Sequence, residues 1–313
     1  MRKEPFIRAT EVWVPTSDGK NIDLQAGLYG DLDNFAAISR GMRFAHGEGL
    51  PGKTWQAGHP IVLKDLRNSY FRRGDAAMSD GLSCAVAVPT FADGTLKSVI
   101  VFFCGDDRFR VGALELWSRQ DGDIDLNLVD GYFGRAEKFE FTSRNTSFPR
   151  RMGLPGRVWD SGHPEILDDF GRGNMFLRRD AAEKVGINRA VGIPCSSTGD
   201  KPWVLTFLSA QNSPIAGRFE IWTKDGTSGG YRFEHGFCES GEDLNSTYAG
   251  TLLPADTGPI AKAAATGVPS IVDDIGAETG PAFVSAKGAG HKSMVALPIP
   301  GQADFDTVLA WFV

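Results

Sequence analysis

Apolar and polar residues alternate along residues 22–29, which is the pattern of a strand with one buried face. Residues 11–14 form a second strand-like run, and the Asp18-Gly19 pair between the two runs is a turn signal. The sequence therefore predicts a hairpin. The same succession returns at residues 114–128 and 219–233, so the chain predicts three similar hairpins.

A phrase rich in glycine and proline follows the first hairpin. Residues 49–60 run Gly-Leu-Pro-Gly-Lys-Thr-Trp-Gln-Ala-Gly-His-Pro. Proline is preset for the first turn of a helix, and glycine often stands just after the last turn. We therefore expect a short helix over residues 51–57 that stops at Gly58, followed by a short strand at residues 60–63.

The rest of the unit is a helical stretch and two apolar strands. The stretch carries Ala76-Ala77 and ends at Gly81, and the apolar runs are residues 84–88 and 98–103. The predicted order is strand, strand, helix, strand, helix, strand, strand. This order is typical of an α+β domain built on an antiparallel sheet.

The glycine-proline phrase is repeated 104 residues later, at residues 153–164. A third copy, at residues 258–269, is degenerate. Solenoid repeats are much shorter, roughly 20–50 residues. A period near 104 residues is the size of a whole domain. The sequence thus predicts three domains, and the third is a degenerate copy: residues 1–107, 108–213 and 214–313.

The order of these motifs resembles that of a GAF domain, and most closely the GAF modules of bacterial signalling proteins. The resemblance covers nearly all of each repeat and is strongest in the first two. It implies an α+β, profilin-like fold in which short helices and loops roof a ligand pocket on one face of the sheet. It also implies regulatory work, namely the binding of cyclic nucleotides, other small molecules or tetrapyrroles, often with dimerisation.

The chain departs from that family between its repeats. GAF domains carry a helix before the first strand and another after the last, and both cover the back of the sheet. Here the segments 105–112 and 210–217 are too short for two helices. An uncovered apolar sheet face is a liability. We therefore expect the three back faces to pack against one another or against another chain.

Aromatic, imidazole and guanidinium groups beside the implied pocket are the candidate ligand-binding residues. In the first repeat they are Trp55, His59, Arg72 and Arg73, and in the second they are Trp159, His163, Arg178 and Arg179. A tryptophan can stack on a planar ligand, a histidine can titrate, and an arginine can hold a carboxylate or phosphate.

Each candidate also has a structural interpretation. The tryptophan can anchor its helix in the core, and the histidine can satisfy a turn. The arginines can form surface ion pairs with Asp75 or Asp180. The third repeat lacks the large polar and aromatic residues, so we expect any ligand in the first two repeats and a structural role for the third.

Three aspartates recur in every repeat, even the degenerate one. They are Asp65, Asp169 and Asp274. Their persistence favours loop architecture, in which a carboxylate accepts backbone N–H bonds, over ligand chemistry.

Known catalytic signatures are missing from the sequence. It has no Gly-x-Ser-x-Gly elbow, P-loop or His-Glu-x-x-His motif. The cysteines stand at non-equivalent places without metal-ligand spacing, so no cofactor or metal is predicted: Cys84, Cys104, Cys195 and Cys238.

Charge and hydropathy narrow the class of protein further. The net charge is −6, with no basic block, which argues against nucleic acid. No run of 18 apolar residues and no secretory leader is evident, so we expect no membrane span and a cytoplasmic location.

These expectations combine into one predicted function and one alternative. The predicted function is a non-enzymatic sensory or regulatory protein that binds a small molecule and signals to a partner protein, with a homodimer left open. The alternative is an interaction scaffold whose pockets are vestigial and filled by side chains.

Overall fold

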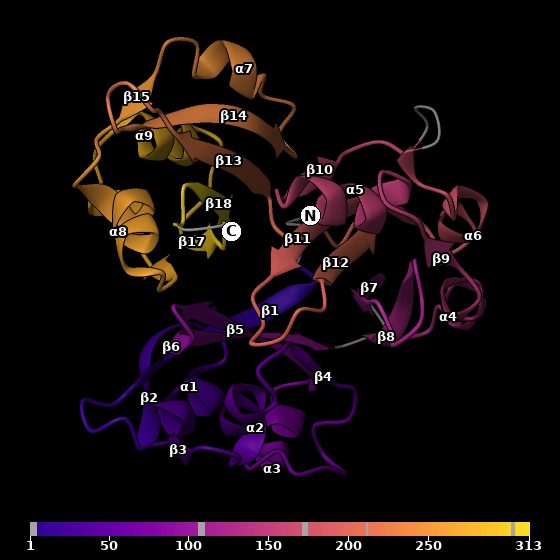
Figure 1. Cartoon of the computed structure of the whole chain (residues 1–313). Helices are drawn as coiled ribbons and strands as arrows, with labels where there is room; N and C mark the ends of the chain where they lie inside the picture. Colours follow the sequence, from indigo (N-terminus) through magenta and orange to yellow (C-terminus); the bar gives the residue numbers. More distant parts are fainter. Residues whose placement is uncertain (1–4, 106–109, 171–174, 211, 302–303) are drawn as a thin grey trace.

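The computed structural model describes residues 5–105, 110–170, 175–210, 212–301 and 304–313. These residues form three six-stranded antiparallel sheets, one in each repeat (Figure 1). We call the repeats domain 1 (residues 5–105), domain 2 (residues 110–210) and domain 3 (residues 212–313).

Domain 1 has the strand order β3-β2-β1-β6-β5-β4. Its elements are β1 (Ile7–Pro15), β2 (Asn21–Leu28), α1 (Asp33–Arg40), β3 (Arg43–Ala45), α2 (Gly49–Ala57), β4 (Ile61–Leu63), α3 (Gly74–Ser79), β5 (Leu82–Ala92) and β6 (Thr95–Gly105).

Domains 2 and 3 repeat this topology. Domain 2 contains β7 (Gly112–Ser118), β8 (Leu126–Tyr132), α4 (Glu137–Arg144), β9 (Ser147–Phe148), α5 (Gly153–Ser161), β10 (Glu165–Leu167), α6 (Arg179–Glu183), β11 (Ile187–Cys195) and β12 (Trp203–Ala210). Domain 3 contains β13 (Arg218–Lys224), β14 (Tyr231–Cys238), α7 (Leu244–Thr247), β15 (Leu252–Leu253), α8 (Gly258–Thr266), β16 (Ser270–Val272), the 3-10 helix η2 (Ile275–Ala277), α9 (Pro281–Gly288), β17 (Met294–Ile299) and β18 (Thr307–Phe312).

The glycine-proline phrase forms the helix that its sequence predicts. In α2 the chain leaves the helix at Gly58, whose φ of 68° lies in the left-handed region that glycine tolerates best. Gly162 and Gly267 end α5 and α8 with the same φ. The predicted helix, its stop and the short strand after it are confirmed.

One helix in each repeat escaped the sequence prediction. The predicted order has two helices, but α1 and the short strand β3 stand between the hairpin and α2. The helix α1 is only eight residues long, and it buries Phe35, Ala36 and Ser39 on one side. Eight residues make little more than two helical turns, too short a stretch for the helical period to stand out in the sequence, so the predicted unit lacks this helix.

The two faces of each sheet belong to different cores. In β6, Val101 packs with the helices of its own domain, whereas its neighbour Phe102 points to the centre of the molecule. Phe102 meets Phe207 of domain 2 and Trp311 of domain 3, each at 5.3 Å between ring centroids. The prediction that the back faces pack against one another is therefore confirmed.

The connections between domains are as short as the sequence indicates. The strand β6 ends at Gly105 and β7 begins at Gly112, while β12 ends at Ala210 and β13 begins at Arg218. Neither connection has room for the two helices that would cover a back face. The neighbouring domains take the place of those helices.

The three domains form a closed ring with the helices outside and the back faces inside (Figure 1). At two of the three interfaces, the fourth strand of one domain lies beside the second strand of the next. Thus β4 lies beside β8, and β16 of domain 3 returns to β2 of domain 1. Between domains 2 and 3, Arg189 of β11 reaches Glu239, which follows β14.

No helix in the described part of the chain is long and apolar enough to cross a membrane.

Candidate functional site

A buried glutamate marks the middle of each helix-covered sheet face. Glu11, Glu115 and Glu220 have no exposed surface, and each stands two residues before a buried tryptophan on the first strand. The tryptophan Nε1 donates a hydrogen bond to the glutamate, at 3.0 Å in domain 1, 3.2 Å in domain 2 and 2.8 Å in domain 3. A buried carboxylate needs further partners, because an unpaired charge is costly away from water.

In domain 1 the main partner of Glu11 is Arg73. The guanidinium contacts both carboxylate oxygens, with Nη2 at 2.9 Å from Oε2. It also donates to Ser39 of α1 and lies over the ring of Phe35, 4.6 Å from its centroid. Tyr29 donates its hydroxyl to Glu11 at 3.1 Å. A charged pair with bidentate geometry and aromatic cover thus fills the space between sheet and helices.

Domain 2 builds the same cluster from equivalent residues. Arg178 pairs with Glu115, with Nη2 at 2.8 Å from Oε2, and donates to Ser143 of α4. Its guanidinium lies 4.9 Å from the centroid of Phe139. Thr206 adds a hydrogen bond to Glu115 at 3.0 Å.

These pairs correct one expectation about the arginines. The structural interpretation, one of two left open, paired the arginines with Asp75 or Asp180 at the surface. Instead Arg73 and Arg178 are 3% and 4% exposed, and their partners come from the first strand of the sheet. Local spacing suggested the aspartates, whereas a contact across more than 60 residues leaves no trace in local spacing.

The neighbouring arginines lie at the surface. Arg72 forms an ion pair with Glu48, just before α2. Arg179 reaches Glu183 one turn along α6, with Nε at 2.7 Å from Oε1. The candidate arginine pairs therefore divide into one buried and one exposed member.

The candidate tryptophans are half-buried on the outer helices. Trp55 of α2 meets His46 edge to face, with 4.9 Å between ring centroids. The guanidinium of Arg150 lies over Trp159 of α5, 4.7 Å from the ring centroid. Trp159 thus lies against an exposed arginine of its own domain, whereas Trp55 lies against a histidine.

The candidate histidines lie between domains. His59 stacks on Trp203 of domain 2, with ring centroids 4.3 Å apart and planes 10° apart. His163 lies 3.3 Å from the hydroxyl of Thr307 in domain 3. These side chains contact the next domain of the ring, so the structure does not gather them with the buried arginines.

Two of the recurring aspartates organise loops. Asp65 accepts the backbone N–H groups of Arg67 and Asn68 at 2.9 Å, and Asp274 accepts that of Gly276 at 2.7 Å. The loop interpretation is confirmed for these two residues.

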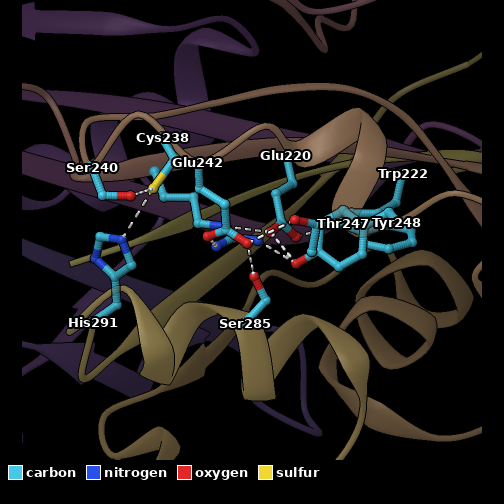
Figure 2. A network of polar contacts seen from close by, with 10 residues as sticks. Glu220, Trp222, Cys238, Ser240, Glu242, Thr247, Tyr248, Ser285 and His291 are labelled. Atoms are coloured by element: carbon cyan, nitrogen blue, oxygen red, sulfur yellow. Dashed lines mark hydrogen bonds and ion pairs between the residues drawn. The ribbon is translucent and has the colours of Figure 1, made fainter.

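Domain 3 replaces the buried arginine with one from the sheet itself. Arg218 stands on β13, at the place of Ala9 and Ala113 in the other domains, and its Nε lies 2.6 Å from Glu220. Tyr248 occupies the position of Ser39 and Ser143 and donates to Glu220 at 2.7 Å (Figure 2).

The domain 3 cluster extends to the surface through a second carboxylate. Glu242 accepts from Arg218 at 2.8 Å, from Thr247 at 2.8 Å and from Ser285 at 2.5 Å (Figure 2). Its side chain is 27% exposed. Burial opposes ionisation, but the hydrogen bonds from Ser285 and Thr247 and the charge of Arg218 lower the pKa of Glu242 below its usual value.

A histidine and a cysteine border this cluster. Nε2 of His291 lies 3.8 Å from Sγ of Cys238, which also contacts Ser240 at 3.0 Å (Figure 2). Burial and the nearby charge of Arg218 lower the pKa of His291 to about 4. The imidazole is therefore neutral near pH 7.

The sequence contained a signal for these clusters that the prediction did not use. A glutamate precedes the buried tryptophan by two residues in every repeat, inside an otherwise apolar strand. A charged residue on the buried face of a strand requires a buried partner. The position of that partner still could not be deduced, since the arginine lies 62 residues away in domain 1 and two residues away in domain 3.

Comparisons with known proteins return single domains. No protein-family model and no curated protein matches the sequence. A GAF domain from A. aeolicus is similar at 22% identity, over 32% of this chain and 59% of that chain, with a TM-score of 0.26. The free methionine-R-sulfoxide reductase of Neisseria meningitidis is similar at 17% identity, over 31% and 52%, with a TM-score of 0.25.

A GAF domain/HD domain protein of Geobacter sulfurreducens is similar at 16% identity, over 32% of this chain and 65% of that chain, with a TM-score of 0.28. The chain spans 59% and 52% of the first two of these proteins. At such TM-scores the likeness carries no argument about activity.

The architecture itself matches what the sequence resemblance implied. Each repeat has a six-stranded antiparallel sheet in one strand order, with its helices on one face and the glycine-proline phrase in the same helix. The chain consists of three tandem GAF-like domains.

Proposed function

We propose that this chain is a non-enzymatic regulatory protein that acts through contacts with other proteins. The observation that carries the proposal is the filling of the helix-covered faces in domains 1 and 2. Arg73 and Arg178 occupy the space where a ligand of a GAF-like domain would lie, and each is held by a buried glutamate.

The energetics support closed pockets in these two domains. A ligand would have to displace a guanidinium that is paired on two oxygens and covered by aromatic rings. Separating a buried ion pair leaves an uncompensated charge and costs roughly 3–5 kcal/mol. Few small molecules would regain that free energy in the same space.

Small-molecule sensing is the second candidate function, and domain 3 favours it. Glu242, Ser285 and Thr247 form a polar cluster that reaches solvent above the buried Arg218. In domains 1 and 2 a ligand would instead contact the outer candidates, namely Trp55 with Arg72 and Trp159 with Arg179.

Native mass spectrometry of the protein purified from its source tests the choice. We expect the mass of the bare chain, alone or with protein partners. Hydrogen–deuterium exchange on the same sample should be unchanged by a library of nucleotides and small carboxylates.

A co-purifying small molecule that protects α3 or α6 from exchange would contradict closed pockets. Protection confined to α7 and α9 would support sensing in domain 3. Turnover of a library compound would contradict the non-enzymatic assignment.

A further inference from the structure

We call the interface between two neighbouring domains a seam. The seam between domains 1 and 2 is held together by polar contacts. The ammonium of Lys64 lies 2.8 Å from Asp130, and the hydroxyls of Ser83 and Tyr132 are 2.7 Å apart. The backbone of Thr198 donates to the carbonyl of Gly58 at 2.9 Å. Together with the stack of His59 on Trp203, these contacts hold both ends of the seam.

The seam between domains 2 and 3 has equivalent fastenings. Arg189 lies 3.3 Å from Glu239, and its guanidinium is 4.9 Å from the ring centroid of Phe237. His163, the counterpart of His59, contacts Thr307. The same pair of positions therefore joins domain 1 to domain 2 and domain 2 to domain 3.

The third seam, between domains 3 and 1, is built differently. The strands β16 and β2 pack together, and apolar side chains such as Ala26, Leu28 and Ile271 line the contact. Ala26 stands where domain 2 has Asp130. The N–H of Phe6 donates a backbone hydrogen bond to the carbonyl of Pro214 at 2.7 Å, and Phe102 contacts Trp311, so these two domains are also joined near the centre. Among the residues that the structure describes, however, no side-chain hydrogen bond or ion pair is found between domain 3 and domain 1.

The seam between domains 3 and 1 lacks the contact that the histidine makes in the other two seams, and a buried hydroxyl stands at that place. Val268 occupies the position of His59 and His163, and Ser98 occupies that of Trp203 and Thr307. Ser98 is fully buried, and its hydroxyl has no hydrogen-bond partner within the described ranges. A polar group in that state opposes closure of the seam, because in the open form water would satisfy it.

The exposure of the edge strands agrees with a weaker seam. Val62 and Leu63 of β4 are 7% and 9% exposed, and the equivalent residues of β10 are similarly buried. In β16, by contrast, all three residues are only half-buried. This seam is also the one that no linker spans, since the linkers join domain 1 to 2 and domain 2 to 3.

We propose that the ring opens at the seam between domains 3 and 1, and that a second copy of the chain is the partner of the opened seam. The face of β2 already fits the face of β16. In a dimer of two opened rings, β2 of each chain packs against β16 of the other chain. The same contact therefore forms twice. Pairing covers the apolar residues that opening exposes. The proposal does not depend on any ligand.

Restoring the missing fastening tests the proposal. The Val268→His variant places a histidine opposite Ser98, as His163 stands opposite Thr307. We expect hydrogen–deuterium exchange in β2 and β16 to slow about fivefold to tenfold, with little change in β4 and β10. Val284→His makes the same substitution on the exposed side of α9 and should leave exchange in both strands unchanged.

A second variant tests the same prediction in case Val268→His does not fold. Ser98→Ala removes the unpartnered hydroxyl and should also slow exchange in β2 and β16. The wild-type protein should show a species of twice the chain mass by light scattering as its concentration rises, and both variants should reduce that species.

Two results would overturn the proposal. Wild-type exchange in β2 and β16 as slow as in β4 and β8 would show that this seam is no weaker than the others. A single-chain mass at every concentration, up to several hundred micromolar, would rule out the second copy as the partner.

Discussion

Arg218 and Glu220 form their buried ion pair from positions two residues apart on one strand. The first two domains form the equivalent pair from residues 62 and 63 positions apart in sequence. The glutamate beside the tryptophan is thus the constant element, and the positive charge has moved from a loop to the sheet. Tyr248 has changed along with it, since its hydroxyl now fills space that Ser39 leaves to Arg73 in domain 1.

Removing the buried guanidinium of domain 1 should destabilise the protein strongly. We expect Arg73→Met to lower the free energy of unfolding by about 3–5 kcal/mol, because it leaves Glu11 buried without a cation. Urea denaturation measures the loss. Arg72→Met is the matched control, since it removes an adjacent exposed ion pair and should cost no more than about 1 kcal/mol. Equal losses in the two variants would contradict a special role for Arg73.

Neutralising the glutamate should matter less in domain 3 than in domain 1. Glu11→Gln leaves Arg73 without the carboxylate that holds it, whereas Glu220→Gln leaves Arg218 paired with Glu242. We expect the domain 1 variant to lose about 1–3 kcal/mol more stability than the domain 3 variant. Thermal and urea unfolding of both variants provide the comparison, and the reverse order would show that Glu242 does not compensate.

The neutral state of His291 makes stability depend on pH. Its pKa is lowered from 6.5 to about 4 in the folded protein, so the unfolded chain binds a proton more readily. The stabilisation is complete above about pH 6.5 and is lost as the pH falls toward 4. His291→Gln should therefore flatten the fall in Tm between pH 7 and pH 4.5. Parallel wild-type and variant curves would show that other groups cause the fall.

The helix-ending glycines Gly58 and Gly162 hold equivalent positions in domains 1 and 2, but the space around them differs. Gly58 and Gly162 share a φ of 68°, so alanine at either site costs about 1 kcal/mol in backbone strain. A Cβ at Gly58 would lie 2.1 Å from the hydroxyl of Thr198, whereas a Cβ at Gly162 meets no atom within 4 Å.

We therefore expect Gly58→Ala to lower Tm more than Gly162→Ala. It should also speed exchange at Thr198, whose N–H bonds to Gly58 across the seam. Equal effects on Tm and on exchange would indicate that the loop around Thr198 yields without cost.

The repeated phrase made the fold predictable, because it combines local signals. Proline at the start of α2 and glycine at its end act within one helix, and the alternation along β2 acts within one strand. The packing of the back faces was also predictable, since short linkers leave no other cover. The helix α1 was missed because it contributes only a few buried residues.

The candidate sites were harder to predict, because their chemistry depends on contacts between distant segments. Arg73 stood out as a pocket residue, but its buried partner Glu11 lies on the first strand of the sheet, 62 residues away in the sequence. His59 stood out beside the same pocket, yet its neighbour Trp203 belongs to the next domain. Local pattern identifies an unusual residue but does not identify what it touches.

The contact of Phe102 with Phe207 and Trp311 at the centre of the molecule constrains how the sequence of each repeat can change. Each repeat supplies one ring to a junction that three rings complete. Losing a repeat would leave two aromatic faces in water. The inner side of each repeat is therefore constrained by this shared contact, whereas its outer side remains free to diverge.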